Sequence, residues 1–335
     1  MGVYAGLVEA MRGMSPVSCH SHHLPDGEQV FKDLDGIIAR SYVEWSLVPH
    51  GPGFGEREAF LDLVRHKSYF VWLERSLVEL YDLPAGLGSD TWEECSRRIS
   101  AAYADPDWHL RLLSERCRFR TSILDAYWCP GDDGGHPGHF RPSFRIDDFL
   151  GAWAPARPNN DGNSFLSLHG RRIGELDELL SFLRDSVFAM KAGGAVALKS
   201  AVAYDRGLAF PKAAEGLARA ALRKGEEADP TEVQAFQSQV FWAACRIAAE
   251  AGLPFQIHTG LGQLRQTRAL GLVDAIEANP ETKFVLFHGS YPWTDDIVAL
   301  AHNFPNVYPD LCWLPLISPT RAITFVKEMV EVGTA

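Results

Sequence analysis

The sequence lacks the features that mark several large classes of protein. Its six cysteines form no CxxC pair, its lysines and arginines do not cluster, and no stretch approaches the roughly 20 apolar residues of a membrane span. The net charge is −11 and the isoelectric point lies near 5.5, so a nucleic-acid partner is not expected. The first residues carry neither a basic leader nor a long apolar run. We therefore expect a reduced, cytoplasmic protein with no membrane partner.

Two common catalytic signatures are also missing. There is no GxSxG elbow for a nucleophilic serine and no Walker-type loop for a nucleotide. The glycines of Gly260-Leu-Gly262 follow a histidine and do not open a phosphate-binding repeat. Serine hydrolases and P-loop enzymes are therefore not supported.

The bulk composition is that of an ordinary globular protein. Apolar residues make up 46% of the 335 residues and charged residues make up 22%. The length exceeds the roughly 250 residues of a plain (β/α)8 barrel but suits such a barrel with insertions. We predict a single domain over residues 1–335.

Short apolar segments alternate with amphipathic ones along most of the chain. This alternation is typical of βαβ units and hence of a parallel sheet. The predicted strands are a first one from Val17 to His22, followed by Ser122–Trp128, Ser143–Ile146, Ala195–Ala203, Pro254–Thr259, Lys283–His288 and Asn306–Leu311.

Helical spacing dominates between the first and second predicted strands. From about Glu28 to Cys117, apolar residues recur three and four positions apart, which predicts a helical insertion over 28–117. Within it, Asp90 followed by Glu93 resembles a capping box. Further helices are predicted from about Glu175 to Met190, from an N-cap at Asp229 to Gly252, and from Ser318 to near Gly333.

The strand count favours an α/β fold of the TIM type that lacks its eighth strand. Seven strands are predicted, and the sequence ends at Ala335 just after the helix that should lead to an eighth. Without that strand the first and seventh strands keep exposed edges, which natural proteins normally cover. Either the chain is cut short here or the barrel does not close.

The strongest local motif is His20-Ser21-His22 on the first predicted strand. Residues two apart on a strand point to the same side, so both imidazoles can reach one divalent ion. The motif is weak evidence alone, because His23 could shift the register and a histidine-rich surface turn would look similar.

Two further histidines end apolar strands. His258 and His288 each close a short apolar strand and are followed within two residues by glycine. Barrel enzymes carry their working groups at the carboxyl ends of the strands. Either histidine alone could be a satisfied core residue, but together with the HxH motif they indicate a site.

These histidines resemble the pattern of the amidohydrolase superfamily, in particular its amidohydrolase-related, or family 2, branch. The resemblance runs from His20 to Asp310, and the helical insertion is similar to that of uronate isomerases. It implies that His20, His22 and His258 hold one divalent metal ion, zinc first, with manganese or iron as alternatives. It also implies that His288 polarises the substrate or moves a proton.

The sequence departs from that family pattern in places. Ser18 stands where the family has an aspartate two residues before the first histidine. The metal-binding aspartate of strand eight has no counterpart, and Asp310 matches the strand-seven position instead. The general base is therefore not visible in this sequence.

Lys199, in the fourth predicted strand, is the second catalytic candidate. A buried lysine is costly unless it is paired. It could bind a substrate carboxylate, bridge two metal ions as a carboxylated lysine, or form a structural ion pair, and the first role is favoured.

Four other residues are candidates for substrate binding. The planar guanidinium of Arg145 matches a carboxylate. Tyr204 and Arg206 follow the fourth strand and could complete a polar pocket or belong to a solvated loop. Trp313 could stack on a substrate ring or simply pack.

Together these features predict a metal-dependent hydrolase that acts on a C–N or C–O bond of a small, acidic molecule through metal-activated water. A uronate-isomerase-like or decarboxylase-like enzyme is one alternative. The other is a degenerate barrel that binds a small ligand without catalysis. A homo-oligomer is compatible with the sequence but not specified by it.

Overall fold

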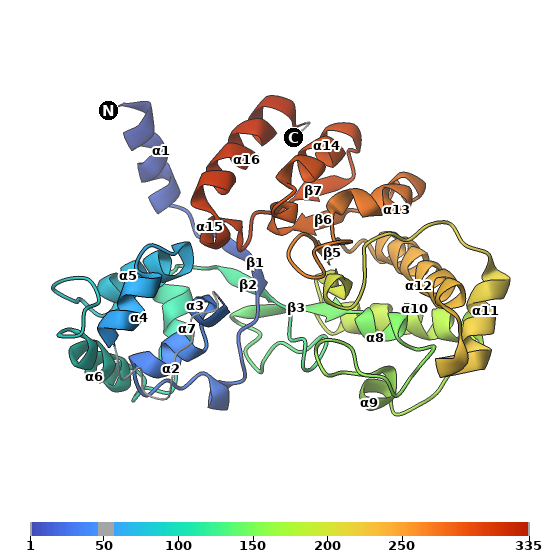
Figure 1. The fold of residues 1–335 in the computed structure, drawn as a ribbon, viewed down its shortest axis with the longest axis horizontal. Coiled ribbons are helices and arrows are strands. Elements are labelled where there is room, and N and C mark those ends of the chain that lie inside the picture. The colour runs from blue at the N-terminus through green and yellow to red at the C-terminus, as the bar shows by residue number, and fades with distance from the viewer. Residues whose placement is uncertain (1, 46–56, 334–335) are drawn as a thin grey trace. The chain divides into compact units, whose positions relative to one another are not determined.

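A computed structural model describes residues 2–45 and 57–333, which fall into two compact units (Figure 1). The helical unit comprises Met1–Val17, Leu24–Thr121 and Pro315–Pro319. The sheet unit comprises Ser18–His23, Ser122–Leu314 and Thr320–Ala335. Each unit is described by itself below.

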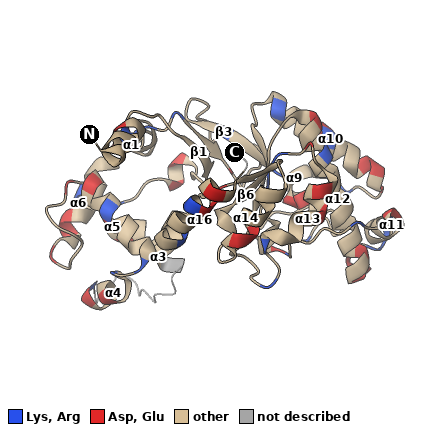
Figure 2. Cartoon of the chain, turned by 90° about the horizontal axis from the view of Figure 1, so that it is seen from above, with Lys and Arg blue, Asp and Glu red and all other residues tan. Residues whose placement is uncertain are grey.

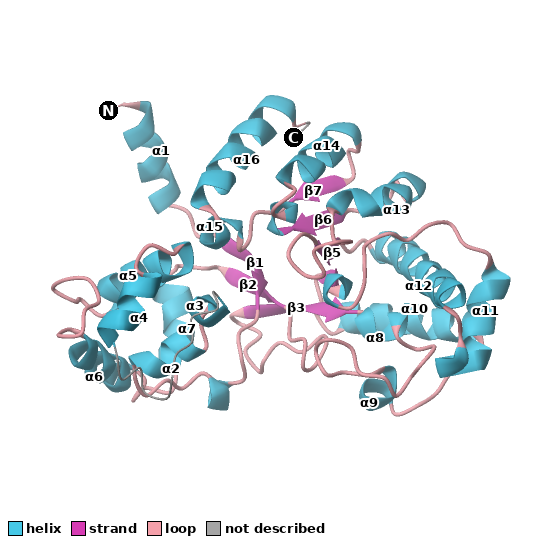
Figure 3. Ribbon diagram, viewed as in Figure 1, coloured by secondary structure: helices cyan, strands magenta, loops and turns pink. Residues whose placement is uncertain are grey.

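One seven-stranded sheet forms the centre of the sheet unit (Figure 3). The strands lie side by side in chain order, and every pair from β2 to β7 is parallel. The α/β fold of the TIM type with seven strands and no eighth in the described residues is therefore confirmed, and each strand lies at its predicted position. The strands are β1 (Val17–Ser21), β2 (Thr121–Leu124), β3 (Phe140–Arg145), β4 (Ala197–Ser200), β5 (Phe255–His258), β6 (Phe284–Phe287) and β7 (Val307–Pro309).

Burial on both faces explains why the central strands are almost continuously apolar. Every residue of β4 and β5 is buried. Parallel strands covered by helices on their outer face and by side chains on their inner face have no solvent side that would need polar residues. The few polar side chains on these strands therefore stand out as candidates for a site.

Helices follow the strands from β3 onward. They are α8 (Asp147–Leu150), α9 (Phe165–His169), α10 (Leu176–Ala192), α11 (Glu215–Lys224), α12 (Pro230–Ala251), α13 (Val273–Ala278), α14 (Thr294–Asn303), α15 (Leu314–Ile317) and α16 (Pro319–Val332). The predicted start of α12 is confirmed: the Asp229 carboxylate accepts hydrogen bonds from the amides of Thr231 and Glu232, and the Glu232 side chain accepts one from the amide of Asp229. Gly252 ends this helix in the left-handed conformation.

The helical unit has its own core. Its helices are α1 (Val3–Arg12), α2 (Leu34–Ala39), α3 (Tyr42–Trp45), α4 (Arg57–Val64), α5 (Ser68–Leu80), α6 (Trp92–Ala102) and α7 (Trp108–Arg111). Phe60, Phe70 and Trp92 pack edge to face within a cluster of fully buried side chains. The region predicted as a helical insertion, 28–117, lies in this unit.

The capping box predicted at Asp90 is wrong. Helix α6 begins at Trp92, and its N-cap is Thr91, which makes no capping hydrogen bond. The Thr91 hydroxyl instead accepts from the amide of Gly88 at 2.8 Å, and Glu93 pairs with Arg57 at 2.7 Å. Glu93, the second member of the predicted box, is thus engaged elsewhere.

The charge distribution shows no single-sign surface along the helices. Figure 2 shows acidic and basic residues interspersed on the helices of both units. Within the described ranges, none of the helices combines the length and the apolar character that crossing a membrane requires.

Candidate metal centre and polar network

His20 and His22 meet at the end of β1 in the sheet unit. Their ring centroids are 4.4 Å apart and the ring planes stand at 80°. The Nδ1 atom of His22 lies 2.8 Å from the carbonyl oxygen of Asp125, to which it donates. The Nδ1 atom of His20 is buried and has no hydrogen-bond partner in the described part of the chain. His20 therefore offers a buried nitrogen atom that no described protein group satisfies.

Asp125, directly after β2, is the acidic member of this group. Its side chain is 1% exposed, and both of its oxygens contact Arg145: Nε lies 3.1 Å from Oδ1 and Nη2 lies 2.6 Å from Oδ2. Burial alone would raise the pKa of Asp125, but the charges of Arg145 and Lys199 hold it well below its usual range. Asp125 is thus ionised throughout the physiological range.

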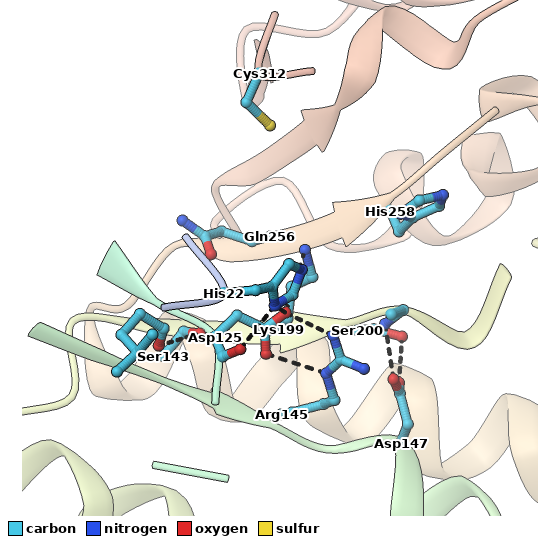
Figure 4. A network of polar contacts seen from close by, with 12 residues as sticks. His22, Asp125, Ser143, Arg145, Asp147, Lys199, Ser200, Gln256, His258 and Cys312 are labelled. Carbon is cyan, nitrogen blue, oxygen red and sulfur yellow. Dashed lines mark hydrogen bonds and ion pairs between the residues drawn. The ribbon is translucent and has the colours of Figure 1, made fainter. Parts of the chain in front are cut away.

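Lys199 lies in the same network, on β4. Its ammonium is 3.7 Å from Oδ2 of Asp125 and 4.0 Å from the centroid of the Phe287 ring. Burial lowers the pKa of Lys199 to about 8, against the opposing charge of Asp125. In the β3–β4 register Lys199 is the direct partner of Arg145. Figure 4 shows the side chains of Asp125, Arg145 and Lys199 turned toward one another.

Arg145 is already occupied on both sides of its guanidinium. Besides Asp125 it binds the Asp161 carboxylate through Nη1. A guanidinium held by two carboxylates has little left to offer a substrate, and here it neutralises and orients Asp125. Its role in substrate binding stays a prediction.

His258 and His288 form a second histidine pair. Nδ1 of His258 lies 3.0 Å from Nε2 of His288. The outer nitrogens face backbone carbonyls: Nδ1 of His288 is 2.8 Å from the oxygen of Cys312, and Nε2 of His258 contacts the oxygen of Leu261. Burial lowers both pKa values, that of His258 to about 3, so both rings are neutral near pH 7.

The two neutral rings of His258 and His288 have fewer N–H groups than they have hydrogen-bonding contacts. A neutral imidazole carries one N–H, and each outer nitrogen uses it to donate to a carbonyl. The two inner nitrogens then face each other with lone pairs and no hydrogen between them. A proton or a cation between them would satisfy both lone pairs, although burial opposes the charge and lowers both pKa values.

Tyr204 and Trp313 lie against these histidines. The Tyr204 ring is 4.5 Å from that of His258, and the Trp313 ring is 5.1 Å from that of His288, edge to face. Both predicted substrate-binding residues are therefore beside the predicted catalytic histidine or its partner.

Arg206 lies elsewhere. It donates to the carbonyls of Gly207 and Ala209 and to Oε1 of Gln237, and it lines a separate cavity of about 300 Å³ bordered by α8 and α12. Asp147 lines the same cavity and accepts hydrogen bonds from Ser200 Oγ at 2.6 Å and Ala201 N at 2.7 Å. Burial raises the pKa of Asp147 to about 7.

His20, His22 and Asp125 fit a single divalent ion. One ligand atom from each lies within 4.8 Å of the others. Imidazole and carboxylate are the donors that zinc, manganese and iron accept, and the hydrogen bond from His22 to a carbonyl is the usual support for a ligating histidine. His258 is not part of this group.

The sequence prediction did not include Asp125, which lies inside the predicted strand Ser122–Trp128. The only signal for it was an acidic side chain near the end of an apolar segment.

Comparison with known proteins bears on the second half of the chain. Residues 189–333 match the family model described as Amidohydrolase. This part of the chain is similar to that family. The predicted resemblance to amidohydrolases is confirmed, and the matched segment contains Lys199, His258 and His288.

One curated relative of this chain is protein fluG of Emericella nidulans. The two are 38% identical over 84 residues, which is 24% of this chain and 10% of the fungal protein. The match thus spans about a tenth of that relative's length.

Solved structures resemble this chain in fold over nearly its whole length. A uronate isomerase from Thermotoga maritima matches with a TM-score of 0.75 at 18% identity, covering 96% of this chain and 81% of that one. A glucuronate isomerase from Caulobacter crescentus matches with a TM-score of 0.72 at 17% identity, covering 98% and 80%. At these identities the likeness shows a shared fold.

Proposed function

We propose that this chain is a metal-dependent hydrolase that cleaves a C–N or C–O bond of a small, acidic molecule. The observation that most supports it is the convergence of His20, His22 and Asp125 at the carboxyl ends of β1 and β2. Catalytic groups of barrel enzymes lie at that end of the strands.

His20, His22 and Asp125 are the proposed ligands, with His258 as the further ligand that the family resemblance implies. When bound, the divalent ion, zinc or else manganese or iron, lowers the pKa of a water molecule and polarises a carbonyl group. The chain's part is to hold the ligands: Arg145 orients the Asp125 carboxylate, and the Asp125 carbonyl orients His22.

The charges around the site favour an anionic substrate. The histidines are neutral, and the Asp125 charge is already offset by Arg145 and Lys199. A divalent cation added to this group leaves an excess of positive charge in a buried place, where an acidic substrate would offset it. Lys199 is the proposed partner of a substrate carboxylate, and Tyr204 and Trp313 would border the substrate.

Proton transfer is assigned to His288. Its Nδ1 faces the Cys312 carbonyl and its Nε2 carries no hydrogen in the neutral ring, so Nε2 is the atom that would accept a proton and return it to the leaving group. The proposed setting is the cytoplasm, because all six cysteines are unpaired.

Metal content and turnover test the proposal together. Purified protein supplied with zinc, manganese or iron is analysed for bound metal and incubated with a panel of lactams, lactones and uronates. We expect His20→Ala and His22→Ala to lose about one ion per chain and all hydrolysis relative to the unaltered protein. The matched control is His66→Ala, since His66 is exposed and lies in the helical unit. Unchanged metal content in both site variants would contradict the proposal and favour the non-catalytic barrel.

A uronate isomerase activity is the second candidate. It is favoured by the two solved structures with TM-scores above 0.7, both of which are uronate or glucuronate isomerases. Mass spectrometry of the products in ¹⁸O-labelled water separates the two reactions, because hydrolysis places a water oxygen in the cleaved product. Conversion of a uronate without change of mass would assign the isomerase.

A further inference from the structure

Two thiols and a carboxylate meet where β1 lies closest to the end of β7. We call Cys19, Asp310 and Cys312 the thiol cluster. The Cys19 thiol donates a hydrogen bond to Oδ2 of Asp310 at 2.7 Å, and Oδ1 of Asp310 accepts one from the Cys312 amide at 2.7 Å. The residues come from positions 291 apart in the sequence, so the tertiary fold alone brings them together.

The dimensions of the thiol cluster suit a metal ion. Its two sulfur atoms and a carboxylate oxygen all lie within 4.8 Å of one another. Zinc binds thiolate sulfur at about 2.3 Å, so two sulfurs on one ion are at most about 4.6 Å apart. These separations are compatible with three ligand atoms around one centre.

We propose that the thiol cluster is a second metal site, separate from His20, His22 and Asp125, which binds one zinc-class ion through two thiolates and the Asp310 carboxylate. On binding, each thiol loses its proton to solvent and the carboxylate exchanges its thiol hydrogen bond for the metal. Two thiolates and one carboxylate carry three negative charges against two on the ion. The fourth position stays open to water or a further ligand.

The Asp310 carboxylate adds an oxygen ligand that two cysteines forming a disulfide would not need. It accepts hydrogen bonds from the Cys19 thiol and from the Cys312 amide, so it lies at the centre of the thiol cluster. Thiols and carboxylates together are a ligand set for zinc and its softer relatives. The other four cysteines do not join such a group in the described residues, because the only other cluster of this kind is His20, His22 and Asp125.

The second site would also act on the His258–His288 pair. The carbonyl of Cys312 receives the hydrogen bond from Nδ1 of His288, and the Cys312 sulfur lies 3.3 Å from the same nitrogen. An ion on Cys312 would therefore fix the segment that orients the His258–His288 pair. This proposal does not rest on the proposed hydrolase activity.

Cobalt and cadmium titrations of the full chain test the second site. Thiolate ligands give intense charge-transfer absorption with these ions, whereas histidine and carboxylate ligands do not. We expect the unaltered protein to develop this absorption at about one ion per chain. Cys19→Ser and Cys312→Ser should abolish it, Asp310→Asn should weaken binding at least about tenfold, and Cys117→Ser, an exposed control, should leave it unchanged.

The histidine variants make the two sites separable. His20→Ala with His22→Ala should retain the thiolate absorption, even if the proposed function fails. Circular dichroism checks that each variant is folded. If a cysteine variant does not fold, Asp310→Asn still tests the site. Absent thiolate absorption in the folded protein, or absorption that survives both cysteine substitutions, would overturn the proposal. A mass two hydrogens below that of the reduced chain, mapped to Cys19 and Cys312, would assign a disulfide instead and equally overturn it.

Discussion

The guanidinium of Arg145 and the carboxylate of Asp125 face each other side-on, with contacts of 3.1 and 2.6 Å, and both side chains are at most 5% exposed. Such a pair depends on having both members, because removing one leaves the other charge buried without a partner. It joins the end of β2 to β3, and Asp125 is itself a proposed ligand of the candidate metal centre.

Replacing Arg145 by Met should destabilise the protein strongly. The Asp125 charge would lose its main partner, and a broken buried pair costs about 3–5 kcal/mol. Urea unfolding of the metal-free protein measures the loss. Arg141→Met on the same strand is the control, because Arg141 is exposed and its change should stay within about 0.5 kcal/mol. Equal effects of the two substitutions would contradict a buried pair.

Lys199 should make the metal-free protein more stable as the pH rises from about 8 toward 10.5. Its pKa is lowered from 10.5 to about 8 in the folded state, so in that window the unfolded chain binds more protons than the folded one. The gain is on the order of 3 kcal/mol. Lys199→Met should flatten this slope, whereas Lys212→Met, at an exposed position, should keep it. Denaturant unfolding at pH 7.5 and 10.5 measures the stability of both variants. An equal pH dependence of stability in the two variants would refute the assignment of this effect to Lys199.

Asp147 should have the opposite pH dependence. Its pKa is raised from 3.8 to about 7, so the folded state holds the extra proton and stability falls as the pH rises through that window. Asp147→Asn should remove this fall between pH 5 and 8. Asp185→Asn is the control, because Asp185 is exposed and its replacement should leave the fall in stability unchanged. Thermal unfolding at the two pH values is the measurement, and a fall that persists in Asp147→Asn would rule the carboxyl out.

His288→Asn should separate proton transfer from metal binding. We expect turnover of the substrate found in the panel to fall by about 10²–10⁴-fold, which is the usual contribution of a positioned acid or base. Bound metal in the His20 site should stay at the level of the unaltered protein. Loss of that metal in parallel with turnover would show that His288 supports the ligands instead.

Much of the fold follows from patterns that are local in the sequence. The apolar segments around Phe255–His258 and Phe284–Phe287 are strands because they are bounded by turns and buried on both faces. Helix α12 starts at Asp229 because the capping hydrogen bonds join residues three apart. The same rule failed at Asp90, because the N-cap of α6 is Thr91 and the Glu93 side chain pairs with Arg57.

The site residues also differ in whether the sequence could predict them. The HxH spacing and the strand-end positions of His258 and His288 could be read from the sequence alone, because strand geometry sets where such side chains point. The prediction could not include Asp125 as the partner of Arg145 and Lys199, since that contact depends on the registers of β2, β3 and β4. It likewise could not place Arg206 in a separate cavity, because that depends on which acceptors the neighbouring loop and α12 present.

Sequence by itself determined the elements, their order and the residue types at the strand ends, because hydrogen bonding and burial within one element involve near neighbours. Tertiary structure alone decided which charges neutralise each other and which donors converge. Asp125 with Arg145, and Cys19 with Asp310, are pairs of this kind, 20 and 291 residues apart. Their distances are fixed by the packing of parallel strands, which no local pattern encodes.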